Sequence, residues 1–148
     1  MDNVRVPDGA ACTMNGTVAQ GTVKVGTGAS LDAIGVRVIG NVQAESARSV
    51  IVRGNSFVGG SIQVVQGGSA RIVFTKIQGD ILFDENKALL VANDNVLGGN
   101  LQAFKNTGGL TIRRNQIDGN LQCKENRPPP TGGGNVVHGN KQDQCARL

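Results

Sequence analysis

A glycine returns every 19 or 20 residues along nearly the whole chain. The recurring positions are Gly21, Gly40, Gly60, Gly79, Gly99, Gly119 and Gly139. The residues that follow also repeat, as in Gly40-Asn-Val-Gln-Ala and Gly99-Asn-Leu-Gln-Ala. A fixed short period of this kind is the signature of a solenoid, in which each repeat packs only against its neighbours.

Apolar and polar residues alternate after each glycine, which is typical of a strand with one buried face. The polar row reads Arg5, Lys24, Gln43, Gln63, Gln102, Gln122 and Gln142, and Leu82 interrupts it. The flanking apolar rows are Val4, Val23, Val42, Ile62, Ile81, Leu101 and Leu121, and Val6, Val25, Ala44, Val64, Phe83, Ala103 and Cys123. This pattern predicts one short strand per coil, stacked in parallel on its counterpart in the next coil.

Two further strands are predicted in each coil. The second has inward rows at Cys12, Leu31, Ile51, Ala70, Leu90 and Leu110, and at Met14, Ala33, Arg53, Ile72, Ala92 and Ile112. The third is marked by Ala19, Val38, Val58, Ile77, Leu97, Ile117 and Val137. Arg53 is a misfit in its row, which indicates a local bend or a misalignment of that coil. Strands this closely spaced cannot pair as hairpins within one repeat, so they must pair between coils.

We therefore predict a single all-β domain, residues 1–148, made of about seven coils and a capped tail. The coils start near residues 2, 21, 40, 60, 79, 99 and 119, and the cap spans residues 127–148. Asparagines recur in phase at three corners, where we expect their side chains to stack and hydrogen-bond along the rod. These corners are Asn86, Asn106 and Asn126; Asn95, Asn115 and Asn135; and Asn41, Asn100, Asn120 and Asn140, with Ser61 and Asp80 in the gaps.

Two strings, Arg114-Asn-Gln-Ile-Asp-Gly-Asn and Asp94-Asn-Val-Leu-Gly-Gly-Asn, resemble repeats of right-handed parallel β-helix proteins of the pectate-lyase-like superfamily. The likeness covers residues 2 to about 143. It is closest to uncharacterised secreted bacterial β-helix proteins, over Gly119-Asn-Leu-Gln-Cys-Lys-Glu-Asn and the ending Asp143-Gln-Cys. The resemblance implies a right-handed parallel β-helix. The absence of a six- or five-residue sub-period argues against hexapeptide and pentapeptide helices.

The three cysteines lead to different expectations. Cys12 falls in an inward row and is expected to be a buried free thiol. Cys123 and Cys145 lie one coil plus two residues apart, so a tail folded over the open end would bring their sulfurs together. The alternative is a pair of unbonded thiols. A disulfide would lock the cap and indicate an oxidising compartment, so we expect a secreted or cell-surface protein. The prolines in residues 127–134 fit a strand terminator.

Composition excludes several classes of function. The net charge is +4, from 15 basic and 11 acidic residues that are scattered along the chain. With no Trp or Tyr to stack on bases, this composition does not predict nucleic-acid binding. No apolar run reaches the ~20 residues of a membrane span, and no leader pattern is visible. His138 stands alone without metal-ligand spacing. We therefore predict no catalytic, cofactor-binding or metal residues and no cofactor.

A carbohydrate-active enzyme is the alternative that the resemblance implies, because related β-helices include lyases and glycosidases. Its acids would be Asp80, Asp84 and Glu85. Glu85 stacks with Lys105 and Glu125 in neighbouring coils, however, which is an ordinary surface charge ladder. An ice-binding face is disfavoured, because its candidate row is broken by charge and bulk. That row reads Thr13, Asp32, Val52, Arg71, Val91, Thr111 and Thr131.

The favoured hypothesis is a non-catalytic structural, binding or scaffold module. Its outward glutamines, Gln43, Gln63, Gln102 and Gln122, form a regular surface for a polysaccharide or a protein. An outward apolar patch predicts self-association into a homo-oligomer. Its residues are Ile34, Val52, Val73, Phe74, Leu82 and Val91. A register slip of one residue would instead turn such side chains inward. A third hypothesis is a self-assembling scaffold resembling bactofilins, whose β-helices polymerise end to end. The proline-rich cap argues against such growth.

Overall fold

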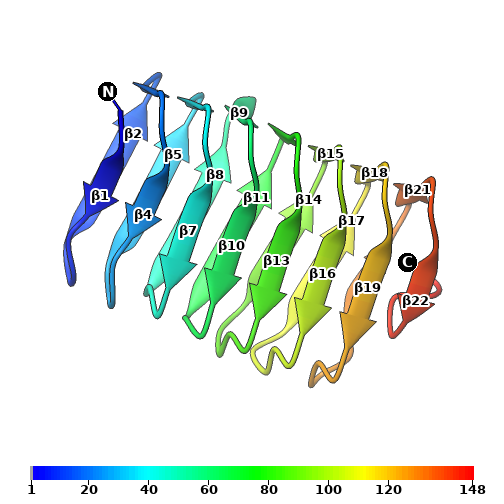
Figure 1. Ribbon diagram of the computed structural model, residues 1–148. Helices are drawn as coiled ribbons and strands as arrows, with labels where there is room; N and C mark the ends of the chain where they lie inside the picture. The colour runs from blue at the N-terminus through cyan, green and yellow to red at the C-terminus, as the bar shows by residue number, and fades with distance from the viewer. Residues whose placement is uncertain (1) are drawn as a thin grey trace.

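The computed structural model describes residues 2–148 as a parallel β-solenoid of about seven turns (Figure 1). Three strands in each coil build three sheets that run along the rod. Sheet A contains β1 (Val4–Val6), β4 (Val23–Val25), β7 (Val42–Glu45), β10 (Ile62–Val65), β13 (Ile81–Asp84), β16 (Leu101–Phe104), β19 (Leu121–Lys124) and β22 (Lys141–Asp143). Sheet B contains β2 (Ala11–Asn15), β5 (Ser30–Ile34), β8 (Ser49–Arg53), β11 (Ser69–Val73), β14 (Leu90–Asn93), β17 (Leu110–Arg113) and β20 (Thr131–Gly133). Sheet C contains β3 (Val18–Ala19), β6 (Arg37–Val38), β9 (Ser56–Val58), β12 (Thr75–Ile77), β15 (Val96–Leu97), β18 (Gln116–Ile117) and β21 (Val136–Val137).

The winding of the rod is right-handed. In Figure 1 the chain descends along sheet A in front, rises along sheet B behind, and advances by one coil with each circuit. Every strand pairs in parallel with its counterparts in adjacent coils, as β13 does with β10 and β16. The handedness agrees with the general preference of parallel strands for right-handed crossovers. No helix long and apolar enough to cross a membrane occurs in residues 2–148.

The core is one continuous apolar column enclosed by the three sheets. Its largest fully buried side chains include Phe83, Ile62, Ile72 and Leu101. The predicted inward rows of sheets A and C are confirmed, since Val, Ile, Leu and Ala from each coil stack on the same types above and below. Burial of these rows supplies the main stabilising term, as expected for branched apolar side chains in parallel strands.

The recurring glycine is required by a close approach between coils. A Cβ at Gly99 would collide with Oδ1 of Asp80 and with the carbonyl oxygen of Gly79, both in the preceding coil. The equivalent collision arises at Gly60, with Asn41 and Gly40. The glycine therefore lets the corner of each coil sit directly against the side chain and backbone of the coil before it.

The predicted register of the third coil is wrong by one residue in sheet B. Val50 pairs with Leu31 and Ala70, and Val52 pairs with Ala33 and Ile72. Val50 and Val52 therefore point inward, while Ile51 is half-buried and Arg53 is exposed. The physical reason is that the spacing from Leu31 to its inward counterpart is one residue shorter than assumed. Arg53 thus faces solvent, and it bonds to Asp32.

This shift also corrects the predicted apolar patch. Val52 is 0% exposed and belongs to the core. Val73 and Val91 are each only 8% exposed, and Ile34 and Leu82 are half-buried. Phe74 alone among the six is open to solvent, at 56% exposure. The predicted patch is therefore reduced to one exposed ring at the corner between sheets B and C.

The C-terminal end of the rod is closed by its own tail. Cys123 and Cys145 form a disulfide and are both buried, which confirms the predicted pairing. The side chain of Leu148 is also buried against the core. Cys12 is a free thiol as expected, but it is half-buried rather than buried, because the first coil has no neighbour on its outer side within residues 2–148.

Candidate binding surface

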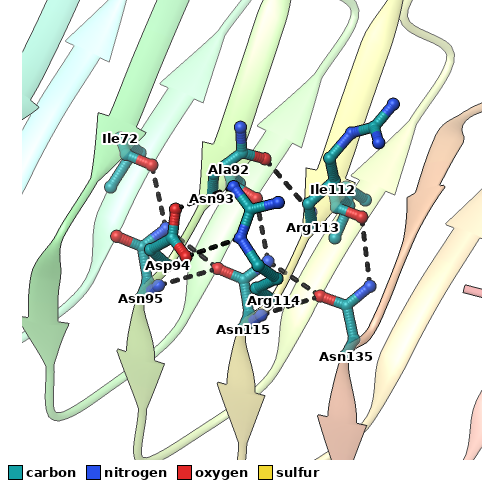
Figure 2. Close-up of polar contacts among 10 residues, drawn as sticks. All are labelled: Ile72, Ala92, Asn93, Asp94, Asn95, Ile112, Arg113, Arg114, Asn115 and Asn135. Atoms are coloured by element: carbon teal, nitrogen blue, oxygen red, sulfur yellow. Dashed lines mark hydrogen bonds and ion pairs between the residues drawn. The ribbon is translucent and has the colours of Figure 1, made fainter.

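Two buried asparagine ladders hold the corners of the rod. Figure 2 shows the ladder of Asn95, Asn115 and Asn135 between sheets B and C. Oδ1 of Asn115 accepts hydrogen bonds from the backbone N–H and Nδ2 of Asn95, at 3.0 and 3.1 Å. Nδ2 of Asn115 donates to the carbonyl of Ala92 and to Oδ1 of Asn135, at 2.8 and 2.9 Å. These bonds fix the spacing of successive coils and so keep the outward faces regular.

The second buried ladder lies between sheets A and B and ends in the cap. It links Asn86, Asn106 and Asn126 in the same way. Oε1 of Gln144 then accepts from the backbone N–H and Nδ2 of Asn126, at 2.9 and 3.0 Å. The carbonyl of Leu148 closes the first ladder by accepting from Asn135. The tail thus supplies the two acceptors that another coil would have provided.

A third ladder at the corner between sheets C and A runs in the opposite sense. Here each backbone N–H donates to a side-chain oxygen of the preceding coil, as Asn120 does to Asn100 at 2.7 Å. The ladder spans the rod through Asn3, Thr22, Asn41, Ser61, Asp80, Asn100, Asn120 and Asn140. The predicted third corner is confirmed, and Asp80 has a structural role within it.

The outward face of sheet A carries the predicted polar row, and Leu82 divides that row into two different parts. In the C-terminal part, Gln102 donates to Gln122 and Gln122 donates to Gln142, at 2.9 and 2.7 Å. In the N-terminal part, neither Gln43 nor Gln63 has a side-chain hydrogen-bond partner within residues 2–148. The amides of Gln43 and Gln63 are therefore available to a ligand, whereas those of the C-terminal part are largely occupied.

An open groove of about 770 Å³ lies over the N-terminal part of sheet A. Its floor includes Lys24, Gln43 and Gln63, and its side is formed where the chain turns from sheet A toward sheet B. Ser46 and Gln66 lie on that side with positive φ angles, which places them in the left-handed region of a tight turn. The groove follows the rod over four coils, and its floor changes from basic side chains, Arg5 and Lys24, to the amides of Gln43 and Gln63.

Charges of both signs line this groove. Arg5 lies 3.7 Å from Asp8, and Oδ1 of Asp8 accepts a hydrogen bond from the backbone N–H of Thr27. Lys24 and Glu45 provide a second basic and a second acidic side chain. The opposite charges balance, so the groove has no electrostatic bias toward a strongly anionic or cationic ligand.

The three acids of the enzyme alternative occupy different environments. Asp80 accepts a hydrogen bond from the backbone N–H of Asn100 within the third ladder. Asp80 immediately precedes β13 and Asp84 is its last residue. The Cα atoms of Asp80 and Asp84 therefore lie about 13 Å apart at the usual rise of a strand. Glu85 follows Asp84 at an exposed turn with positive φ.

Partial burial raises the pKa of Asp84, neighbouring Glu85 raises it further, and Lys105 partly offsets both effects. The folded chain then holds this proton to a higher pH than the unfolded chain. As the pH rises above the ordinary aspartate pKa, ionisation of Asp84 therefore lowers the free energy of unfolding.

We expect Asp84→Asn to raise the melting temperature slightly at neutral pH, and the gain to vanish below the ordinary aspartate pKa, where both states are protonated. Thermal unfolding across this pH range measures it. Asp94→Asn is the matched control with the opposite sign, since Arg114 lowers the pKa of Asp94 through a hydrogen bond of 2.8 Å (Figure 2). A gain for Asp84→Asn that persists at low pH would contradict the assignment.

One further pair of ionisable side chains lies beside sheet C. Nδ1 of His138 lies 2.6 Å from Asp118 on the exposed face of sheet C. Residues 2–148 contain no group of three or more His, Cys, Asp or Glu side chains that could hold a metal ion. The groove itself was missed by sequence reasoning, since a row of alternating residues predicts the floor of such a site but not its side.

Comparison of the chain with protein-family models, with curated proteins and with solved structures finds no match.

Proposed function

We propose that this protein is a non-catalytic binding module that holds an extended, hydroxyl-rich polymer along sheet A. The polymer lies in the groove over the first four coils and is contacted by Gln43 and Gln63. The observation that carries this proposal is the free state of these two amides beside the hydrogen-bonded amides of Gln102, Gln122 and Gln142.

The chemistry of the groove favours a neutral polysaccharide. An amide both donates and accepts hydrogen bonds, which matches the hydroxyl groups of a sugar. Gln43 and Gln63 lie one strand spacing of about 4.8 Å apart, so a regular chain lying along the rod meets the same amide twice in succession. The balanced charges of Arg5, Lys24, Asp8 and Glu45 give no advantage to a polyanion.

We expect the double variant Gln43→Ala with Gln63→Ala to weaken polymer binding about tenfold or more, because two hydrogen bonds are lost. Affinity electrophoresis and calorimetry with a neutral glucan, chitin oligomers, pectin and alginate measure this. The matched control is Gln122→Ala, which removes the same type of side chain from the same row outside the groove. If none of the four polymers binds, or if the control weakens binding equally, the groove is not the binding site.

We also propose that the protein is located outside the cytoplasm. The buried disulfide of the cap supports it, because such bonds form and persist in oxidising compartments. Titration of thiols in protein purified from its natural source tests the point. One reactive thiol after denaturation, from Cys12, is the expected result, and three would contradict it.

A further inference from the structure

The third coil carries one extra residue at the corner between sheets B and C. Its inward residues Val52 and Val58 are six positions apart, whereas their counterparts Ile72 and Ile77 in the next coil are five apart. Every other coil within residues 2–148 keeps the spacing of five. The extra residue belongs to the exposed segment 53–55. A local insertion in a regular solenoid often marks a binding face.

Phe74 lies beside this insertion in the fourth coil. It precedes Thr75, which pairs with Ser56, and is therefore set against residues 53–55. The ring is 56% exposed. The backbone φ angle of Phe74 is 47°, in the left-handed region that a bulky aromatic residue rarely adopts. The fold thus holds a large apolar side chain in solvent, at a backbone angle that disfavours it.

The turn requires the left-handed backbone but not the aromatic ring. In register, Asp94, Arg114 and Gly134 follow Phe74 at this corner in the next three coils. Their φ angles are also positive, at 58°, 53° and 70°. Charged residues and glycine therefore satisfy the same turn, so the presence of Phe74 is not explained by the local conformation.

The ring of Phe74 is also free in a way that the nearby ring of Phe57 is not. The guanidinium of Arg37 covers Phe57, 4.8 Å from the centroid of its ring. Within residues 2–148, no cation lies over the ring of Phe74. An aromatic face without such a partner is available to a ligand.

Polar groups border Phe74 on both sides along the corner. Asn55 contributes an exposed amide from the insertion, and Asp94 contributes a carboxylate from the fifth coil. Arg114 holds that carboxylate through two hydrogen bonds, at 2.8 and 3.1 Å (Figure 2). An apolar ring between an amide and a fixed carboxylate matches a ligand that has an apolar face and a hydroxyl-bearing edge.

We propose that Phe74 is a stacking platform for one sugar ring of a neutral saccharide. The C–H groups on the face of a pyranose pack flat against an aromatic ring, and its hydroxyls reach amide and carboxylate groups at the edge. A single exposed ring offers far less than the roughly 1,000 Å² that a specific protein interface buries, so its size fits one sugar unit. The site shares its ligand class with the groove on sheet A but no residue, so each can fail without the other.

A single fluorophore placed at the ring tests the site directly. The chain contains no Trp or Tyr, so Phe74→Trp introduces the only indole. Oligomers of a neutral glucan or of chitin are expected to shift its emission to shorter wavelength in a saturable way. Gln116→Trp, also exposed but two coils away, is the matched control and keeps its emission. No shift with either oligomer, or an equal shift in the control, overturns the proposal.

Calorimetry with the same oligomers tests whether the natural ring binds. It is carried out in a chain that also carries Gln43→Ala and Gln63→Ala, so that the groove does not contribute. Phe74→Leu is expected to weaken binding about tenfold, because it is apolar but not planar, and Phe74→Tyr is expected to preserve it. Phe57→Leu is the matched control, since that ring is already covered, and leaves binding unchanged. Undiminished binding by Phe74→Leu overturns the stacking role.

Phe74→Gly separates binding from stability. It is expected to abolish the site without lowering the melting temperature, because glycine adopts this backbone angle without steric cost. A lower melting temperature with unchanged binding would show that the ring is structural. A fluorescence shift that disappears with Gln43→Ala and Gln63→Ala would overturn the separate site, whereas a shift that persists supports it even if the groove binds nothing. A concentration-dependent rise above 15.3 kDa that Phe74→Gly abolishes would assign the ring to a second copy of the chain instead.

Discussion

Replacing Asn115 by alanine is expected to lower the free energy of unfolding by about 3 kcal/mol or more. Asn115 is 0% exposed and sits in the middle of its ladder (Figure 2). Its removal leaves the buried backbone N–H of Asn95 and the buried carbonyl of Ala92 without these partners. Each unsatisfied buried group costs about 1–3 kcal/mol. The melting temperature of a chain of this size then falls by about 6–12 °C.

Asn140→Ala is the matched control for this experiment. Asn140 is exposed, and its backbone N–H, rather than its side chain, donates to Asn120. The substitution therefore keeps that hydrogen bond and should change the unfolding temperature little. Thermal and urea unfolding of the two variants and the parent chain measure the difference. Equal effects of the two substitutions would show that the buried ladder contributes no more than an exposed turn.

The repeat period predicts most of the fold because a solenoid converts sequence phase directly into spatial position. Residues one coil apart must stack, so their spacing alone is enough to predict that Asn95, Asn115 and Asn135 lie together. The recurring glycine is equally visible in the sequence, but the physical reason for it is not. At Gly99 it relieves a collision with the preceding coil rather than forming a left-handed turn.

The register of β8 could not be predicted from the sequence pattern. The segment from Val50 to Val52 is apolar at every position, so alternation does not reveal which face is buried. The choice of Ile51 as inward forces Arg53 into the core row, and that misfit is the only signal of the error. Pairing of Val50 with Leu31 resolves it, because Arg53 then reaches Asp32 on the outside. The same one-residue error in the register of β8 also placed Val52 in the predicted apolar patch.

The polar row of sheet A was predictable, but its division into two parts was not. Every glutamine of the row has the same position in its repeat, so the sequence treats Gln43 and Gln122 alike. Gln43 and Gln63 are neighbours in register, as Gln102 and Gln122 are, but only the second pair is hydrogen-bonded. The exposed apolar side chains of sheet C, Val18, Val96 and Val136, were not predicted either. The strands of this sheet are only two or three residues long and show little alternation.

Replacing Cys145 by alanine is expected to destabilise the C-terminal coil selectively. The disulfide to Cys123 closes a loop with a sequence separation of 22 residues. In the chain-entropy description, a loop of that length contributes about 3 kcal/mol. The same tail carries Gln144 and Leu148, which satisfy Asn126 and Asn135. Loss of the disulfide therefore releases both ladder ends together.

Hydrogen exchange distinguishes this local opening from a general loss of stability. In the Cys145→Ala variant, the backbone amides of Asn126 and Asn135 should exchange much faster, while amides in the middle coils keep most of their protection. That gradient is expected because solenoid coils are stabilised mainly by their nearest neighbours. Cys12→Ser is the matched control, since Cys12 is unpaired and half-buried in the first coil. Uniform acceleration along the rod would instead mean that the seven coils unfold as one cooperative unit, with the cap stabilising all of them equally.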